Sequence, residues 1–470
     1  MKNTFSTPNK DKELAIKIAK EVSKLNGHTY YVGGYCRDKC LGTVNKDIDI
    51  EVYGVTADQL RNILDKFGER LEHGKSFGVF GIKGFDIDIA LPRTERCIGT
   101  SHTDFDVNVN PFMSTYEGAL RRDLTMNALM IDVLTDEWVD HFGGINDIKN
   151  GIIRHVNTET FKEDPLRVLR VAQFAARFNM SVASETQKLC ATMDITTLSK
   201  ERIFIEVKKA LEKSETPSIF FNVLRDMGHL IEWFPELQQL IELPQNELYH
   251  PEGDVYTHTM LVLDNVSTNI STDTSNVLGI KLAAVCHDMG KLVTTELIDG
   301  QVHAYQHELY GEDIAKVFLN RFTDNKKLID YVCNMTKLHM APHQTYNNKS
   351  RMKKTNKMFD SSLCPKDLIL LAYCDSLGKY DEDVGYNPNA LEELQWLNDR
   401  YNMFVEVMSR PYIKGQDLVN AGLKPGSYFS ELMELAHKLR LAGVNKNDSL
   451  RQVLATARKF QKQEEMGFLK

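Results

Sequence analysis

The sequence predicts an α+β fold, in which a head with a mixed β-sheet and helices is followed by all-α regions. Residues 30–53 read as two strands joined by a glycine-bearing connection, and residues 78–91 read as a hairpin with period-two alternation. Beyond the head, apolar residues recur mostly at helical spacing. A chain of 470 residues is too long for one hydrophobic core. We therefore expect four regions, which cover residues 1–155, 156–245, 246–385 and 386–470.

The composition, with 42% hydrophobic and 26% charged residues, is typical of a soluble globular protein. The formal charge of −8 does not indicate a nucleic-acid-binding protein, although the total can hide a local basic face. No apolar run reaches about 18 residues and the polar start lacks a signal-peptide core, so we expect a cytoplasmic protein without a membrane segment. Eight cysteines without a C-x-x-C pair favour reduced thiols over a zinc ribbon or disulfides. A monomer and a homodimer are equally compatible with the sequence.

Two aspartates mark the second strand of the 30–53 stretch. Residues i and i+2 of a strand point to the same face, so Asp47 and Asp49 would present two carboxylates side by side. Such oxygen ligands suit Mg²⁺, and a pair of these ions can clamp a nucleoside triphosphate and an attacking hydroxyl. The preceding Gly33 and Gly34 let backbone N–H groups approach phosphate oxygens. In the turn that follows, Arg37 could hold a phosphate or an internal carboxylate.

A D-x-D pair alone is more often a solvated strand edge than a metal site. The glycine pair, the basic turn and the carboxylate pair together favour phosphate chemistry. They form the string VGGYCRD…LG…DIDIEV, which resembles the head motif of the tRNA nucleotidyltransferase and poly(A) polymerase superfamily, and within it the bacterial-type CCA-adding enzymes. The resemblance implies addition of nucleotides to the 3′ end of tRNA from CTP and ATP, with Mg²⁺ as cofactor and without a nucleic-acid template.

The rest of the head adds supporting elements. Residues 11–25 and 57–66 read as amphipathic helices. The hairpin supplies Asp86 and Asp88, and likeness of the following LPRTER to the family's strand end favours Asp88 as a third catalytic carboxylate. A solvated strand face is the alternative. Residues 97–118 read as a long polar loop, a segment that in the family influences the switch from adding C to adding A.

An arginine-rich element, RRDLTMNA, begins at residue 121. It matches the family's RRDxxxNA element, and the resemblance assigns four residues to the triphosphate and the ribose hydroxyls. Forked arginine donors match phosphate oxygens, whereas an isolated RRD would be a surface charge cluster. Residues 140–147, with a glycine turn, resemble the hinge-like motif that closes the head. The four assigned residues are Arg121, Arg122, Asp123 and Asn127.

The segment 161–178 predicts a helix that begins near Pro165. Asp164 and Arg167 share a face and match the EDxxR motif, whose acid and arginine act as a protein template for the incoming base. An acceptor beside a donor pairs with adenine and cytosine, but guanine and uracil leave both protein groups unpaired. Arg170 could add a stacking or phosphate contact, and a simple i,i+3 salt bridge is the alternative reading. The resemblance gives a supporting role to three later residues, Glu201, Arg202 and Glu206.

A second set of candidate ligands lies in the 246–385 region. Three apolar helical stretches that can converge in a bundle carry one histidine, one His-Asp doublet and one aspartate. Mixed nitrogen and oxygen ligands suit Mn²⁺, Ni²⁺, Co²⁺, Fe²⁺ or Mg²⁺ better than structural zinc. Water activated at such a site could attack a phosphoester. The four ligands are His258, His287, Asp288 and Asp375.

The pattern H…HD…D resembles the HD phosphohydrolase superfamily. Its order after the head and neck resembles the HD-containing CCA-adding enzymes, in which the HD unit hydrolyses 2′,3′-cyclic phosphates and 2′-phosphomonoesters. Isolated histidines are more often structural, and His303 and His437 are interpreted in that way. Further candidates are Lys291, as a phosphate contact, and His307, His339 and His343, which could line the pocket, bind phosphate or hold a second ion.

The tail, residues 386–470, is expected to contain a short helix between glycine turns in 411–426 and amphipathic helices over 428–442 and 448–463. Its basic residues face little acid except Asp448, which favours contact with the RNA backbone over a merely solvated helical face. These basic residues are Lys438, Arg440, Lys446, Arg451, Arg458, Lys459 and Lys462.

The sequence thus predicts a CCA-adding nucleotidyltransferase with a second, metal-dependent phosphohydrolase activity. An A-adding enzyme or poly(A) polymerase of the same superfamily is the nearest alternative, which the lack of a basic pair after Gly74 disfavours. Another alternative is an idle head beside an active HD phosphatase, which the intact Asp47 and Asp49 argue against. An RNA-binding module without catalysis would leave both sets of carboxylates dispensable.

Overall fold

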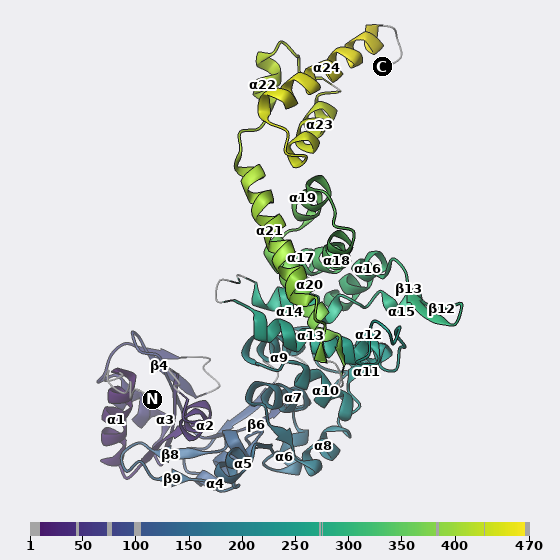
Figure 1. Cartoon of the computed structure of the whole chain (residues 1–470). Helices are drawn as coiled ribbons and strands as arrows, with labels where there is room; N and C mark the ends of the chain where they lie inside the picture. Colours follow the sequence, from purple (N-terminus) through teal and green to yellow (C-terminus); the bar gives the residue numbers. More distant parts are fainter. Residues whose placement is uncertain are drawn as a thin grey trace. The chain divides into compact units, whose positions relative to one another are not determined.

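The structure is a computed structural model that describes residues 10–43, 47–72, 78–97, 105–271, 274, 276–381, 385–426 and 428–465 (Figure 1). The chain divides into two compact units, Met1–Pro235 and Glu236–Lys470. Within the described ranges, no helix combines the length and the apolar content needed to cross a bilayer.

The head is built on a seven-stranded sheet with the order β3-β4-β5-β2-β1-β8-β9. The pair β2–β5 is parallel and the other pairs are antiparallel, so the sheet is mixed, as predicted. The predicted hairpin at 78–91 is confirmed as β4–β5. The strands are β1 (His28–Val32), β2 (Ile48–Tyr53), β3 (Arg70–Glu72), β4 (Val79–Ile82), β5 (Ile87–Ala90), β8 (Met130–Asp132) and β9 (Trp138–Val139).

Three helices accompany the first strands. The predicted helices are present as α1 (Lys10–Ser23) and α3 (Ala57–Leu64), the latter with a capping box. The predicted turn around Arg37 is wrong, because this segment is the helix α2 (Gly34–Leu41). Its buried face carries Cys36, Arg37 and Asp38 rather than an apolar stripe, so hydrophobic periodicity did not reveal it.

The predicted loop at 97–118 is also partly wrong. Residues Arg93–Cys97 form β6 and Phe105–Val109 form β7, which pair antiparallel from Arg93↔Val109 to Cys97↔Phe105. Helix α4 (Thr115–Leu120) follows with a capping box. Apolar residues alternate in FDVNV, which is a strand pattern too short to stand out in a polar segment. Residues 98–104 lie outside the described part.

The remainder of the first unit is mainly helical. Helix α7 (Leu166–Phe178) packs against α9 (Lys200–Lys213) and α10 (Ser218–Asp226). It begins at Leu166, so Asp164 and Pro165 precede it rather than lie within its first turn. The smaller elements are η1 (Thr125–Asn127), α5 (Gly144–Asn150), β10 (Ile152–Ile153), α6 (Thr158–Lys162), β11 (Ser181–Val182), α8 (Ser184–Cys190) and α11 (Leu230–Trp233).

The second unit is a helical bundle around α14 (Val277–Cys286), whose residues are nearly all buried. Helix α13 (Val255–Asn269) packs against α14 and α20 (Pro365–Gly378), and α14 also packs against α17 (Lys326–Leu338). The other helices are α12 (Pro235–Leu240), α15 (Lys291–Thr294), α16 (His307–Asn320), α18 (Met340–Asn347), α19 (Met352–Ser361) and α21 (Ala390–Ser409).

The predicted helical character of this part is confirmed, and two small hairpins lie between the helices. Strands β12 (Thr295–Ile298) and β13 (Gln301–Ala304) pair antiparallel, as do β14 (Tyr380–Asp381) and β15 (Gly385–Tyr386). The first hairpin turns through Asp299-Gly300, both at positive φ, which suits a two-residue hairpin loop.

The tail contains the expected helices, with boundaries shifted by a few residues. They are α22 (Gly415–Asn420), α23 (Phe429–Leu441) and α24 (Lys446–Glu465). Leu418, Leu432 and Val453 are fully buried in a cluster that these helices share. The tail therefore has a hydrophobic core of its own.

Candidate functional sites

Strands β2 and β5 bring the predicted head carboxylates together. In their parallel register Asp49 lies opposite Asp88, and Asp47 directly precedes β2. The intervening Ile48 and Ile50 are buried on the other face of the strand. Burial, and then the neighbouring charges of Asp88 and Asp47, raise the pKa of the Asp49 carboxyl. Because these like charges repel one another, the group fits a divalent cation with oxygen ligands, as Mg²⁺ is.

Glu51, a residue that the sequence analysis did not single out, continues the same face of β2. Its side chain is fully buried, and its carboxylate accepts hydrogen bonds from the Tyr53 hydroxyl (2.7 Å) and Arg121 Nη2 (2.5 Å), with Arg122 Nη2 at 3.6 Å. Although burial favours the protonated form, Arg122 and Arg121 hold the pKa of Glu51 below its usual value. The two arginines are thereby anchored to the carboxylate strand. The sequence does contain a signal for Glu51, because it is the third acid at every second position in DIDIE.

Four other residues that were predicted to bind the nucleotide form an internal hydrogen-bonding network. Arg37 donates to Asp38 Oδ1 (2.8 Å) and to Asn127 Oδ1 (2.9 Å), and its guanidinium lies over the rings of Phe174 and Phe178. Arg37 therefore holds an internal carboxylate, which was one of the two alternatives. The network continues through Asp123, which accepts from Asn127 Nδ2 (3.0 Å) and Arg170 Nε (2.7 Å).

This network stabilises a buried charge. Burial alone would raise the pKa of Asp123, but Arg170 and Asn127 lower it to about 2. The hydrogen bond between Asp123 and Arg170 thus fixes α7 to the head.

The glycine pair lies beside the anchored arginines. Gly33 has φ +61°, a backbone conformation that favours glycine, and precedes α2 without a side-chain cap. A Cβ at Gly33 would lie 3.6 Å from Arg122 Nη1, and Gly34 is the first residue of α2. Uncapped N–H groups at a helix start together with a guanidinium form an anion-binding arrangement.

The predicted template residues are near each other in sequence but have different partners. Asp164 accepts from Arg202 Nη2 at 2.8 and 2.9 Å and from the Leu166 backbone N–H at 3.1 Å. Arg167 donates to the carbonyl oxygens of Thr160 and Arg121, both at 2.7 Å. The alternative of a simple Asp164–Arg167 salt bridge is therefore not what this structure contains.

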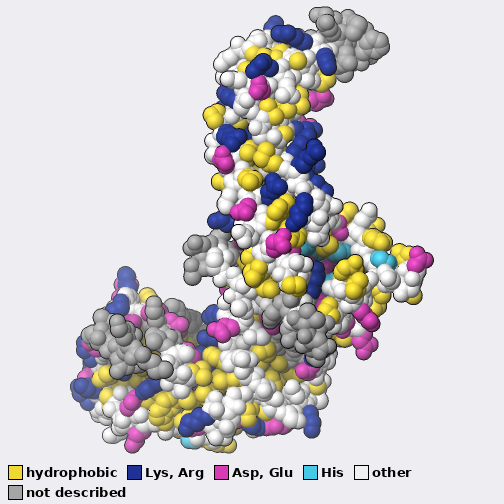
Figure 2. Space-filling view, in the orientation of Figure 1, with side chains coloured by type: hydrophobic (Ala, Val, Ile, Leu, Met, Phe, Trp, Pro, Cys, Tyr) yellow, Lys and Arg dark blue, Asp and Glu magenta, His cyan; other side chains and the backbone are white. Residues whose placement is uncertain are grey.

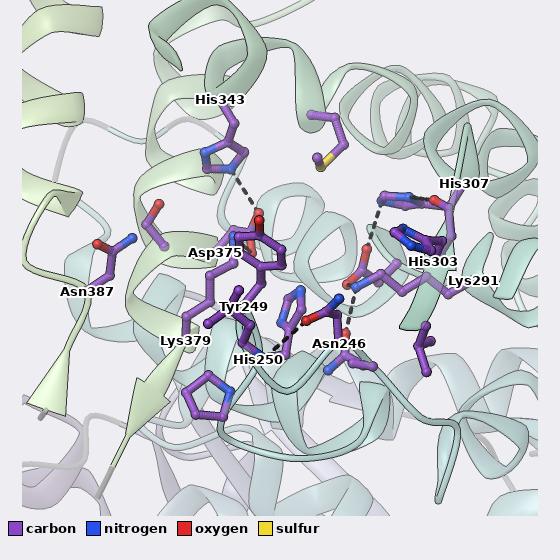
Figure 3. Close-up of a pocket in the computed structure, with 18 of the residues that line it drawn as sticks. Asn246, Tyr249, His250, Lys291, His303, His307, His343, Asp375, Lys379 and Asn387 are labelled. Carbon is purple, nitrogen blue, oxygen red and sulfur yellow. Dashed lines mark hydrogen bonds and ion pairs between the residues drawn. The ribbon is translucent and has the colours of Figure 1, made fainter. Parts of the chain in front are cut away.

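In the second unit the predicted metal ligands converge, and Figure 3 shows Asp375 and His307 at the cavity beside them. The ligand atoms of His258, His287 and Asp375 lie within 4.8 Å of one another, and those of Asp288, His307 and His339 do the same. A third group joins His250 and Glu252 to His258. Among the described residues, every three-ligand cluster of this kind lies in this unit.

Asp288 bridges the first two groups. Its Oδ2 lies 3.3 Å from His287 Nε2 and 3.8 Å from His258 Nε2, while its Oδ1 lies 3.2 Å from His307 Nε2 and 3.6 Å from His339 Nε2. The four predicted ligands therefore lie together, and His307 and His339 extend the cluster at the second oxygen of Asp288. The alternative that His307 and His339 hold a second ion fits this arrangement.

The histidine rings are oriented as metal ligands require. The Nδ1 atoms of His287, His307 and His339 are 2.7, 2.8 and 2.6 Å from the carbonyl oxygens of Ala284, Ala304 and Thr336. Each Nδ1–H donates there, so Nε2 is the nitrogen that can bind a cation, and the Nε2 atoms of His307 and His339 face each other at 3.1 Å. Within the described part of the chain, the buried His287 Nε2 has no hydrogen-bond partner, and Asp288 Oδ2 lies near it at 3.3 Å. A buried imidazole nitrogen near the carboxylates of Asp288 and Asp375 is a ligand set that fits a divalent transition metal.

The remaining candidates surround this centre. His343 is bonded to Asp375 Oδ2 (2.9 Å) and Glu393 Oε1 (2.8 Å). Burial alone would lower the pKa of His343, but these two carboxylates raise it to about 9. His343 thereby helps to orient Asp375. Lys291 Nζ lies 2.7 Å from Asp288 Oδ2 and 2.6 Å from Gln245 Oε1. The sequence alone does not reveal Glu393, because this residue is 50 positions from His343 and looks like a surface acid on a helix.

These groups open into a cavity of about 760 Å³. Asp288, Asp375 and Lys291 contribute polar groups to its wall, and aromatic side chains contribute much of the rest. His303, which was interpreted as structural, lies in this wall too. The aromatic lining residues include Tyr249, His303, Tyr305 and Tyr346.

The basic tail is less available than predicted. Lys438, Lys446 and Arg451 form ion pairs with Glu434, Asp417 and Asp448. Arg440 stacks on Tyr412, whereas Arg458 and Lys459 have no ion pair among the described residues and the side chain of Lys462 lies outside them.

A stronger basic surface lies on α19 and just before it (Figure 2). Its four cations are exposed and form no ion pair within the described part of the chain, and the only acid of the helix, Asp360, is bonded to His437. These cations are Arg351, Lys353, Lys354 and Lys357.

Comparisons with known proteins agree with this geometry. A family model for the poly A polymerase head domain matches residues 29–154. A multifunctional CCA protein of Mannheimia succiniciproducens is 35% identical over 394 residues, which are 81% of this chain and 90% of that protein. A multifunctional CCA protein of Pasteurella multocida is 34% identical over 415 residues, which are 86% of this chain and 94% of that protein.

Solved structures show the same fold. A Bacillus stearothermophilus CCA-adding enzyme in complex with CTP has a TM-score of 0.66 at 18% identity, covering 97% of this chain and 100% of that one. A Thermotoga maritima CCA-adding enzyme complexed with tRNA has a TM-score of 0.62 at 20% identity, covering 97% of each chain.

The mixed sheet with its carboxylate strands, together with the matching head model, places the chain in the class of nucleotidyltransferases that have a poly A polymerase head. The identity to curated relatives over most of both chains narrows this class. The chain belongs to the multifunctional CCA proteins, a family of CCA-adding nucleotidyltransferases.

Proposed function

We propose that this protein adds C, C and A to the 3′ end of tRNA from CTP and ATP, without a nucleic-acid template. The observation that carries the proposal is the register of β2 and β5, which sets Asp49 opposite Asp88, with Asp47 on the same face and the Gly33–Arg122 arrangement in the same head. The relatives named as CCA proteins and the likeness to structures solved with CTP and tRNA support it.

In this proposal the head residues bind metal, bind phosphate or position other side chains. Asp47, Asp49 and Asp88 would hold two Mg²⁺ ions, which supply charge neutralisation for the triphosphate and activation of the attacking hydroxyl. Backbone N–H groups at Gly33 and Gly34 and the guanidinium of Arg122 bind phosphate oxygens. Glu51 holds the arginines in position for that contact. Residues 1–155 form the head and 156–245 the neck.

The nucleotide specificity can be tested directly on RNA ends. We expect tRNA transcripts that end at the discriminator base or at C to incorporate CTP, and transcripts that end at CC to incorporate ATP, in each case with Mg²⁺ and one nucleotide at a time. Incorporation of ATP alone, on any RNA end, would identify an A-adding enzyme or a poly(A) polymerase instead. Gel analysis of end-labelled transcripts distinguishes the products by length.

Base selection is assigned to Asp164 and Arg167, with Arg202 as a positioning residue. Arg202 is 6% exposed and binds the Asp164 carboxylate, so it fixes the acceptor without itself facing a base. Arg167 has guanidinium donors tied to two carbonyl oxygens, which orient its plane. The acceptor and donor match the edges of cytosine and adenine only.

We expect the double variant Asp164→Ala, Arg167→Ala to lose discrimination against GTP and UTP by about 10- to 100-fold, since a mismatched base would no longer leave buried groups unpaired. The ratio of kcat/KM values for CTP and UTP on a transcript that lacks CCA measures this. Glu163→Ala, at the exposed neighbouring position, is the matched control. Unchanged selection in the double variant would refute the template assignment.

For the second unit we infer a metal-dependent phosphohydrolase that acts on 2′,3′-cyclic phosphates and 2′-phosphomonoesters. Residues 246–385 form this region, and 386–470 form the tail. His258, His287 and Asp375 would hold one ion, and Asp288, His307 and His339 a second. Mn²⁺, Ni²⁺ or Co²⁺ bound there supplies activation of water and polarisation of the phosphate. Lys291 and Lys379, which line the cavity beside the two aspartates, contact the phosphate.

The tRNA backbone is assigned to the basic surface of α19 together with Arg458 and Lys459 in α24. Unpaired lysines and arginines bind phosphates through counterion release, whereas cations already in ion pairs gain less. The oligomeric state plays no part in this assignment.

A further inference from the structure

The cavity of the second unit carries an aromatic pair that neither of the activities proposed above uses. His303 and Tyr305 line the cavity wall, and their rings are stacked with centroids 5.1 Å apart and an interplanar angle of 11°. Tyr305 is 66% exposed, so most of its ring surface has no protein partner. In the close-up His303 appears beside His307 and Lys291 (Figure 3).

We propose that His303 and Tyr305 form a stacking platform for the nucleobase of the phosphohydrolase substrate. The inference rests on the proposed phosphohydrolase function and deepens it, because it requires that the substrate be a nucleotide or an RNA end rather than any small phosphoester. Every nucleobase has a π-face, so stacking on aromatic side chains recognises a base without reading its sequence.

The backbone fixes this platform relative to the ligand groups. The carbonyl oxygen of Ala304, between the two aromatic residues, is bonded to His307 Nδ1 at 2.8 Å. His303 also pairs with Glu296 in the β12–β13 hairpin, whose tight turn holds the strands in register. A base stacked on Tyr305 would therefore lie on the same segment, residues 304–307, that orients His307 toward Asp288. This connection places base recognition next to phosphate chemistry.

The charges in the cavity fit the rest of a nucleotide. Lys291 lies 2.7 Å from Asp288, and Lys379 lies 3.7 Å from Asp375, so each cation borders one ligand group. A phosphate at the centre would meet both lysines. In hydrolysis of a 2′,3′-cyclic phosphate, the oxygen of water forms a bond to phosphorus, one ribose P–O bond breaks, and the released ribose oxygen takes a proton.

The competing interpretation is that His303 and Tyr305 only shield the β12–β13 hairpin from solvent and contact no substrate. The same hairpin exposes Leu297, which is 74% exposed and does not line the cavity. A covering role would make Tyr305 equivalent to such a residue and would give it no preference for substrates with a base. The two interpretations therefore differ in their dependence on the base.

The test compares 2′,3′-cyclic AMP with glycerol 1,2-cyclic phosphate, which has the same kind of ring without a base. The full-length chain and its Tyr305→Ala, Tyr305→Phe and Leu297→Ala variants are assayed in turn with Mn²⁺, Co²⁺ and Ni²⁺. We expect Tyr305→Ala to raise the KM for cyclic AMP by roughly 5- to 150-fold, which corresponds to loss of one base–aromatic stack, with little change in kcat. Tyr305→Phe keeps the ring and should keep the KM, and Leu297→Ala should behave as the unaltered chain does.

An equal effect of Tyr305→Ala on both substrates, or no effect on either, would overturn the platform. If the unaltered chain hydrolyses neither substrate with any of the metals, the phosphohydrolase proposal fails, and the platform is then judged by binding. Calorimetric titration of the metal-free chain with AMP should show binding that Tyr305→Ala weakens and Tyr305→Phe retains. Absence of AMP binding, or equal binding by all variants, would refute the platform separately.

Discussion

Asp49→Asn is expected to lower the rate of CTP and ATP incorporation on the order of 10³-fold or more, because an uncharged amide cannot fill the cation-binding role proposed for this carboxylate. The fold should tolerate the change. Burial and the charges of Asp88 and Asp47 raise the pKa of Asp49, so removal of its charge relieves repulsion. Single-turnover incorporation on a transcript ending at CC, together with thermal unfolding, separates loss of chemistry from loss of structure.

The hairpin provides the matched comparison for this experiment. Asp88→Asn should impair incorporation strongly, since Asp88 is in register with Asp49, whereas Asp86→Asn, two residues earlier on the same hairpin, should have a minor effect. If Asp86→Asn were the more damaging, the third carboxylate would be assigned wrongly. If Asp49→Asn retained normal incorporation, the whole metal-site proposal for the head would be wrong.

Asp288→Asn is expected to abolish hydrolysis of 2′,3′-cyclic AMP, by on the order of 10³-fold or more, while CCA addition continues. Asp288 joins both ligand groups, so its loss would disrupt both proposed metal sites at once. The variant also leaves the ammonium of Lys291 without its nearest carboxylate, so it could be destabilised. His287→Ala serves as the second variant. It removes one proposed metal ligand and leaves the Lys291–Asp288 ion pair in place.

The controls for this experiment must report on the second unit. Activity of the head says nothing about its folding, so thermal unfolding is followed by circular dichroism for each variant. His437→Ala removes an exposed histidine bound to Asp360 and should leave hydrolysis unchanged. Chelation should abolish hydrolysis, and metal addition should restore it. Hydrolysis that persists in both Asp288→Asn and His287→Ala would contradict the assigned centre.

The sequence predicted those parts of the fold that follow a regular pattern. Apolar alternation identified β2 and the β4–β5 hairpin, and the 3.6-residue period identified α1, α7 and the tail helices. It missed α2, because that helix buries Arg37 and Asp38 through specific partners instead of an apolar face. A buried polar network has no periodic signature in a single sequence.

The same distinction applies to the sites. The carboxylate pair and the HD doublet were visible as local motifs, whereas their supports come from distant positions. Glu393 reaches His343 across 50 residues, and Arg202 reaches Asp164 across 38. The division of the ligands into two groups also depends on which oxygen of Asp288 faces which histidine, and only coordinates can show this.

The α19 surface has a consequence for the rate at which a polyanion reaches this protein. The chain carries a formal charge of −8, so RNA at long range meets a repulsive field. Four unpaired cations around one helix create an attractive region whose reach is about one Debye length, roughly 8 Å at physiological ionic strength. Approaches from other directions are disfavoured, so encounters become oriented before any contact forms. Added salt screens the long-range repulsion before the short-range attraction, so we expect association to be fastest at intermediate ionic strength.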